Sequence, residues 1–210
     1  MNLSIKIVTS LAGCSFFLTA CGGSSTGSNS FETLASEGRS LIAQYGTAPT
    51  TDIANIPTTG TATYEGVAAY STQYSSPVDI SQYATTVSDV TLTADFANST
   101  VTGTADNFHT VSTPNVTLNG SLALSGNITG NTFSTNLNGT VTETITGLTG
   151  AQASLNGTQL PVSYTGSTSG VFVGSSAEAF RATGTGTGTA TYLGENITQN
   201  VNAVFGGVRE

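Results

Sequence analysis

Strict alternation of apolar and polar side chains is the feature of this 210-residue sequence that most constrains its fold. In "GTATYEGVAAY" (60–70), the even positions are Gly, Ala or Tyr, whereas Thr61, Thr63 and Glu65 occupy the opposite face. The segments 87–96, 115–128 and 132–145 repeat this pattern. Because successive side chains of a strand point to opposite faces, the pattern predicts half-buried antiparallel strands.

The phase of the alternation also predicts the hairpin turns. It switches between even and odd numbers across "ANST" (97–100) and again across "TGNT" (129–132). The Asn-Gly pairs at 119–120 and 138–139 are dipeptides typical of type I′ turns, yet the alternation continues through both. We therefore expect both pairs inside strands, with Gly120 and Gly139 facing the core.

Long amphipathic strands favour a closed sheet, because closure removes the unpaired edges. The segment "RATGTGTGTATY" (181–192) alternates glycine with threonine, and inward glycines let a strand bend tightly at a barrel corner. The sequence therefore predicts an all-β fold: an eight-stranded antiparallel up-and-down β-barrel preceded by one short N-terminal helix.

The predicted helix lies in "NSFETLASEGRSLIAQYG" (29–46), where apolar residues have the spacing of one helix face. Asn29 is the expected N-cap, with Glu32 three residues later, and Gly46 is expected to end the helix. This helix could dock on the barrel or plug one of its mouths, and the sequence leaves both arrangements open.

The first twenty residues have the anatomy of a secretory leader. A single charge at Lys6 is followed by a mostly apolar run (7–20) and then by Cys21 after Leu-Thr-Ala. This pattern resembles the bacterial lipoprotein signal, in which the cysteine becomes the acylated first residue. Cys14 fits the local pattern too, but it would leave a shorter apolar core, so Cys21 is the predicted lipidation site. No Asp follows Cys21, which favours the outer membrane over retention in the inner one.

The predicted organisation follows from these segments. A lipoprotein signal peptide (1–20) precedes a flexible Gly/Ser tether (21–30), an N-terminal helix (31–46) and a β-barrel domain (47–210).

Composition excludes several function classes. The net charge of −8, with 8% charged residues, leaves no basic patch for nucleic acid. With one histidine and one lipidated cysteine, no Ser-His-Asp or Cys-His arrangement is available unless His109 serves. A lone histidine in a polar segment also lacks partners for binding a metal or haem. We predict no catalytic residue, no cofactor and no metal site.

Two carboxylates need an explanation, because the alternation places Glu143 and Glu178 on the core side. A carboxylate in this position either lies in water near a barrel mouth or pairs with a base. We expect the mouth. The alternative partners are Arg39, Arg181 and Arg209.

Several short glycine-containing segments follow one another from Ile56 to Glu210: "GTATYEGVA", "ADFANSTVTGTADNF", "SGNITGNTFSTNLNG", "SGVFVGSSAEAF" and "NAVFGGVRE". In this order they resemble the transferrin-binding protein B-like β-barrel surface lipoproteins, of which this chain would be a small, single-barrel member. The resemblance implies a ligand-binding barrel displayed at the cell surface. It also implies that the partner is a host or environmental protein, or haem.

Two functions remain after these exclusions. The first is an outer-membrane lipoprotein that binds a ligand through its barrel, with the loop 71–86 and Tyr70, Tyr74 and Tyr83 as the expected contact region. The alternative is a structural or adhesive envelope lipoprotein without a specific ligand. We do not expect an enzyme.

Overall fold

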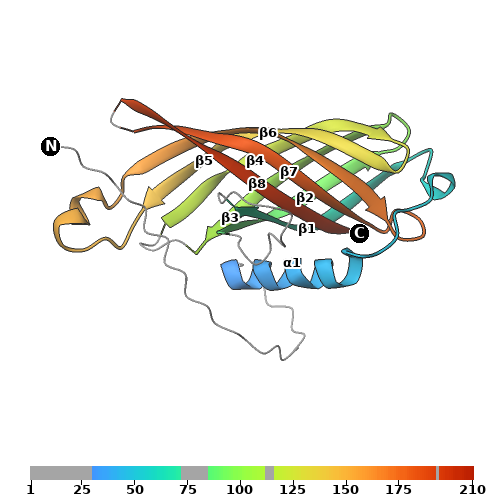
Figure 1. Ribbon diagram of the computed structural model, residues 1–210, viewed down its shortest axis with the longest axis horizontal. Helices are drawn as coiled ribbons and strands as arrows, with labels where there is room; N and C mark the ends of the chain where they lie inside the picture. Colours follow the sequence, from blue (N-terminus) through green and yellow to red (C-terminus); the bar gives the residue numbers. More distant parts are fainter. Residues whose placement is uncertain (1–29, 72–84, 112–115, 193) are drawn as a thin grey trace.

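The computed structural model describes residues 30–71, 85–111, 116–192 and 194–210 (Figure 1). The predicted signal peptide, nearly all of the tether and most of the loop 71–86 lie outside these ranges. The elements are α1 (Phe31–Tyr45), η1 (Ile53–Asn55), β1 (Thr61–Ser71), β2 (Thr86–Asp95), β3 (Thr100–Thr110), β4 (Val116–Thr129), β5 (Thr132–Ile145), η3 (Gly150–Leu155), β6 (Gln159–Val173), β7 (Ala179–Tyr192) and β8 (Glu195–Arg209).

The eight strands form a closed antiparallel barrel in which each strand pairs with its neighbours in sequence. Pairing of β1 with β8 closes the sheet. The predicted fold, an eight-stranded up-and-down β-barrel with one N-terminal helix, is therefore confirmed. Strands β4 to β8 have 14 or 15 residues, whereas β1 to β3 have 10 or 11. One side of the barrel consequently extends beyond the other (Figure 1).

The alternating apolar residues face the interior of the barrel as predicted. An aromatic cluster occupies the end where the turns are short, and the ring of Phe172 lies 5.3 to 5.7 Å from those of Tyr64, Phe96 and Phe133. The hydroxyl of Tyr64 donates a 2.9 Å hydrogen bond to the carbonyl oxygen of Ala177, so the one polar atom of this cluster is satisfied. This end of the barrel is a packed core.

The segment after α1 crosses the same end. Thr51 is buried, and its Oγ1 donates to the carbonyl oxygen of Gly174 at 2.8 Å. The Thr51 amide donates to the carbonyl oxygen of Phe172 at 2.9 Å. These long-range bonds attach the connection between helix and barrel to the end of β6 and to the turn that follows it.

The predicted turns and glycines are confirmed. Strands β2 and β3 are joined by residues 96–99, and β4 and β5 by residues 130–131. Gly120 lies inside β4 opposite Val141, and Gly139 lies inside β5 opposite Leu122. Gly120 has a φ of +139°, and a Cβ there would meet the backbone of Thr140. Glycine is required at this position by conformation and by space.

A β-bulge in β3 changes the phase of that strand. The register shifts between Val87 and Asp89 of β2, opposite Asn107, which has a φ of +51°. The extra residue turns Phe108 into the core, where its ring lies 5.8 Å from that of Tyr70. A bulge that re-aims one side chain in this way cannot be read from a two-residue period.

The outer face of the longer strands is rich in Thr, Ser and Asn. Neighbouring hydroxyls contact each other across strands, as in Thr165 with Thr187 and Thr189 with Thr198, both at 3.4 Å. Thr191 Oγ1 donates to Asn196 Oδ1 at 2.8 Å. The outer wall is therefore polar but carries few charges.

Helix α1 docks on the outside of the barrel, beneath the sheet in Figure 1, and does not plug a mouth. Leu34 is fully buried against Val67 of β1 and Val87 of β2. These two valines interrupt the otherwise polar outer face, and burial of such side chains stabilises the docked helix. Among the described residues, no helix combines the length and the apolar character needed to cross a membrane.

The end of the helix was predicted correctly, but the N-cap was not. Gly46 is the C-cap, and its amide donates to the carbonyl oxygen of Ile42 at 2.8 Å. The N-cap is Ser30 and not Asn29, because the Ser30 hydroxyl accepts from the amide of Thr33 at 3.3 Å. Ser30 thus supplies the bond that a cap must make, one residue later than expected.

Candidate functional site

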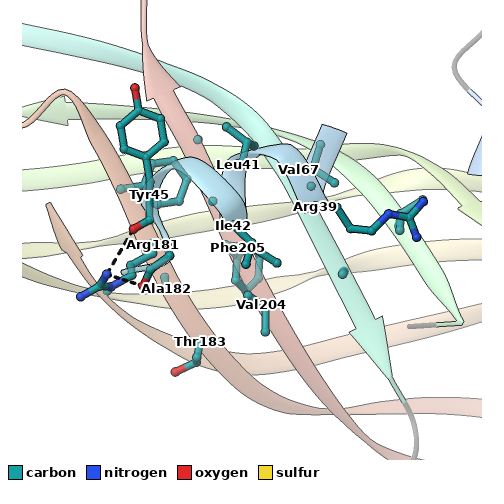
Figure 2. Close-up of a pocket in the computed structure, with 18 of the residues that line it drawn as sticks. Arg39, Leu41, Ile42, Tyr45, Val67, Arg181, Ala182, Thr183, Val204 and Phe205 are labelled. Atoms are coloured by element: carbon teal, nitrogen blue, oxygen red, sulfur yellow. Dashed lines mark hydrogen bonds between the residues drawn. The ribbon is translucent and has the colours of Figure 1, made fainter. Parts of the chain in front are cut away.

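A groove of about 940 Å³ lies between α1 and the outer wall of the barrel (Figure 2). We call it the helix groove. Its lining includes Ala35, Leu41 and Ile42 of α1 and Val204 of β8. A concave, mostly apolar site of this size is typical of a small-molecule pocket.

Arg181 of β7 holds the C-terminal end of α1 beside the groove. Its Nη1 donates to the carbonyl oxygens of Tyr45, Gly46 and Ala48 at 3.2, 2.7 and 3.0 Å. The last carbonyls of a helix have no partner within the helix and carry a partial negative charge. The guanidinium of Arg181 satisfies them, so one outward-facing side chain fixes the position of α1 on the wall.

Arg39 also lines the groove but is held less firmly. Its Nη2 lies 4.0 Å from a carboxylate oxygen of Glu32, and both side chains are more than half exposed. An exposed ion pair of this length contributes little to stability. In Figure 2, Arg39 and Arg181 lie on opposite sides of a region that contains Leu41, Ile42 and Val204.

Two apolar side chains in the groove are unusually accessible. Ile42 is 40% exposed and Val111 is 51% exposed, and both belong to the lining. Large apolar side chains left in water on one concave surface indicate a binding site more strongly than scattered ones do.

A group of carboxylates lies beside α1. Desolvation raises the pKa of Glu37, and the negative charges of Asp89 and Glu65 raise it further. Asp89 itself accepts a 2.7 Å hydrogen bond from Asn107 Nδ2. Within the described ranges, no cluster of three or more His, Cys, Asp or Glu side chains has the geometry of a metal site.

A second group of ionisable side chains lies inside the barrel. Glu143 faces inward from β5 and is half-buried, and desolvation raises its pKa. Tyr164 lies near it, and its pKa is raised to about 12, chiefly by burial. The charge of Glu143 also raises the pKa of Tyr164, whereas a hydrogen bond with Gln199 lowers it. No ion pair with an arginine is found for Glu143 within the part of the chain that the structure describes. Its position agrees with the expected one near a mouth.

The prediction for Glu178 was wrong in one respect. Glu178 does not face the core, because β6 ends at Val173 and β7 begins only at Ala179. It is an exposed residue of the intervening turn, where its carboxylate accepts from the Ser175 hydroxyl. Ala177 in this turn has a φ of 56°, so the alternation of inward and outward side chains does not continue from β6 to β7.

Two further predicted residues can be placed. His109 is half-buried at the end of β3, and its Nε2 lies 3.1 Å from Asn107 Oδ1. Tyr70, expected in the contact region, is instead a core residue, with its hydroxyl 3.1 Å from Ser88 Oγ. Tyr74 and Tyr83, like Cys21, lie outside the described residues.

The helix groove was not predicted from the sequence. Two features of the sequence bear on it. Val67 and Val87 are apolar residues on the otherwise polar faces of their strands, and the segment 31–45 has an apolar face of its own. These features predict that the helix docks on this wall. They do not predict that docking leaves an open groove on its flank.

Comparison with known proteins identifies relatives of the barrel. Residues 56–209 match the family described as C-lobe and N-lobe beta barrels of Tf-binding protein B. No curated protein matches the chain.

Among solved structures, intact Ap-TbpB, with N and C lobes, is 18% identical at a TM-score of 0.39. The match covers 76% of this chain and 28% of that one. The isotype 1 transferrin binding protein B from serogroup B Neisseria meningitidis is 16% identical at a TM-score of 0.38, with coverage of 78% and 27%. This chain therefore spans little more than a quarter of the length of either protein.

Proposed function

This chain belongs to the family of C-lobe and N-lobe beta barrels of Tf-binding protein B, and from that premise we propose that it is an outer-membrane surface lipoprotein that binds a ligand through its barrel domain. The observation that carries the proposal is the family match, which extends over the whole barrel from β1 to β8. In this proposal, residues 1–20 are a signal peptide, Cys21 carries the lipid and residues 21–30 are the tether. The β-barrel domain (47–210), with the N-terminal helix (31–46) before it, is the part presented to the ligand.

The polar outer wall supports a separate anchor. A barrel that spans a bilayer places apolar residues outward and polar residues inward, and this barrel has the reverse arrangement. Attachment to a membrane would therefore depend on another part of the chain. Acylation of Cys21 supplies such an anchor if the cysteine carries more than one acyl chain, because a single chain gives only weak, reversible attachment.

The proposed partner is a host or environmental protein, or haem. The acidic chain, with a net charge of −8, would favour a basic protein by long-range attraction. Its role would be binding and display and not catalysis.

The experiment has two parts. Cells that produce the full chain are treated with protease, and the mature N-terminus is analysed by mass spectrometry. We expect an acylated Cys21 and protease-sensitive barrel at the cell surface, and loss of acylation in Cys21→Ser. An unmodified N-terminus, or a barrel protected from protease until the outer membrane is broken, would contradict the proposal.

Ligand binding is tested separately, by pull-down of partners from serum or growth medium and by titration with haemin. A chain that is anchored and surface-exposed, captures neither and self-associates in solution would favour a structural or adhesive role instead.

A further inference from the structure

We propose that the helix groove binds a long-chain fatty acid, with the acyl chain over the apolar residues and the carboxylate on Arg39. This inference rests on the proposed function, which it deepens by naming a ligand class and a site. The groove lies between α1 and the outer wall of the barrel (Figure 2), and we place the ligand there and not in the lumen.

The apolar residues of the groove favour an acyl chain. Ile42 and Val111 are exposed to water by 40% and 51%, and Leu41 and Val204 line the same groove. Removing apolar surface from water contributes about 25 cal/mol per Å². A polymethylene chain provides that burial without needing hydrogen-bond partners along its length.

The backbone around the groove disfavours a peptide ligand. Peptides that bind in extended form add a strand to an open sheet edge, and the closed barrel has no such edge. The carbonyl oxygens of Tyr45, Gly46 and Ala48 at the end of α1 already accept from Arg181. A peptide in the groove would therefore find few main-chain partners, whereas an acyl chain needs none.

The charges of the groove favour an anionic head group. The whole chain has four Lys and Arg residues at a net charge of −8, yet two of the four, Arg39 and Arg181, line this groove. Arg181 is engaged with the helix end. Glu32 lines the groove too, but its carboxylate lies 4.0 Å from the Arg39 guanidinium and both side chains are exposed, so a ligand carboxylate can take the place of this partner. A guanidinium forms paired hydrogen bonds with a carboxylate.

The same charges distinguish a free fatty acid from the lipid proposed on Cys21. An acyl chain attached to the protein through that lipid carries no carboxylate, so it would leave Arg39 without a new partner. A free fatty acid satisfies both the apolar residues and the arginine.

The test uses the mature chain as proposed above, residues 21–210 with Cys21→Ser, which cannot be acylated at that position and lacks the apolar leader. A photoactivatable palmitate analogue is bound below its micellar concentration, irradiated and mapped by peptide mass spectrometry. We expect adducts in α1, β7 and β8 that unlabelled palmitate prevents. A cationic amphiphile with the same chain length should compete poorly.

Matched variants in the same background test each part of the site. Arg39→Gln should weaken palmitate binding by about tenfold, the loss expected when an exposed guanidinium–carboxylate pair is replaced by a neutral contact. Arg209→Gln, which removes an arginine outside the groove, should not change it. Ile42→Ser should weaken binding, whereas Ile53→Ser, at an exposed position outside the groove, should not.

Three outcomes would overturn the proposal once unchanged melting temperatures show that the variants fold. They are labelling confined to inward-facing residues of the strands, equal binding by the Arg39→Gln and Arg209→Gln chains, and tighter binding of haemin that displaces palmitate. Because the Cys21→Ser variant carries no acyl anchor, failure of palmitate binding leaves the proposal of a surface lipoprotein intact. Failure of acylation or display in cells would likewise leave this binding result unaffected.

Discussion

At the scale of single residues, two threonine hydroxyls in the barrel interior depend on each other. Thr135 of β5 and Thr168 of β6 are both buried, with their Oγ1 atoms 2.6 Å apart. Thr135→Val removes one partner and leaves the other hydroxyl buried without a hydrogen bond, which costs about 1–3 kcal/mol. Urea denaturation should therefore show a lower free energy of unfolding for this variant.

The double variant Thr135→Val/Thr168→Val is the control for that prediction. Replacing both partners by apolar groups of the same shape is nearly neutral, so the double variant should recover most of the stability that the single one loses. A double variant that is less stable than the single one would show that each hydroxyl makes an independent contribution.

Glu143 gives the stability of the barrel a pH dependence. Desolvation raises its pKa in the folded state above the ordinary value of 4.5, so the folded chain holds this proton more tightly than the unfolded chain does. The proton bound by Glu143 therefore adds to the free energy of unfolding at low pH. This added stability is lost as the pH rises from about 4.5 through the raised folded-state pKa.

Glu143→Gln should remove this dependence, because glutamine does not ionise. Melting temperatures measured between pH 4 and pH 8 should converge for the two chains at the acidic end. Toward neutral pH, the Gln variant should become the more stable. Parallel curves over the whole range would mean that the folded-state pKa of Glu143 is not raised.

At the scale of elements, the strands were predictable and the position of the helix was not. The two-residue period depends only on which face of a strand each side chain occupies, so 60–70 and 132–145 could be assigned without knowing their neighbours. The turn at Glu178 and the bulge at Asn107 interrupt that period, and both arise from residues with positive φ.

The candidate site was less predictable than the fold for a related reason. The helix groove forms where α1 lies against β1, β2, β7 and β8, elements that are far apart in the sequence. Arg181 is an example of a contact that the sequence does not predict. From its position in the sequence it was a candidate partner for a carboxylate, whereas in the fold it donates to three carbonyl oxygens at the end of α1. Such contacts depend on where the helix docks.

Helix α1 itself can be strengthened at one position. A Cβ added at Gly38 would make ordinary contacts of 3.6 and 3.8 Å with Val67, and alanine favours a helix over glycine by about 1 kcal/mol. Gly38→Ala should raise the melting temperature. Gly46→Ala in the same segment should lower it, because a Cβ there would collide with the carbonyl oxygen of Ile42.

At the scale of the whole molecule, the barrel depends on the seam where β1 pairs with β8. Gly66 pairs with Gly207 at this seam, and a Cβ on Gly66 would collide with the backbone of Gly206 and Gly207. The close approach of the two strands therefore requires glycine. A larger residue must push the strands apart and expose two unpaired edges, which are templates for association with other chains.

Gly66→Val should therefore disturb the packing around residue 66 and also the pairing of β1 with β8 that closes the barrel. We expect a loss of about 3 kcal/mol or more in the free energy of unfolding, together with aggregates in size-exclusion chromatography. Thr63→Val is the matched control, since it adds the same side chain on the outer face of β1 and should leave the elution volume of the chain unchanged. If Gly66→Val also eluted like the unchanged chain and were as stable as the control, the seam would tolerate a side chain there, and barrel closure would not depend on this glycine.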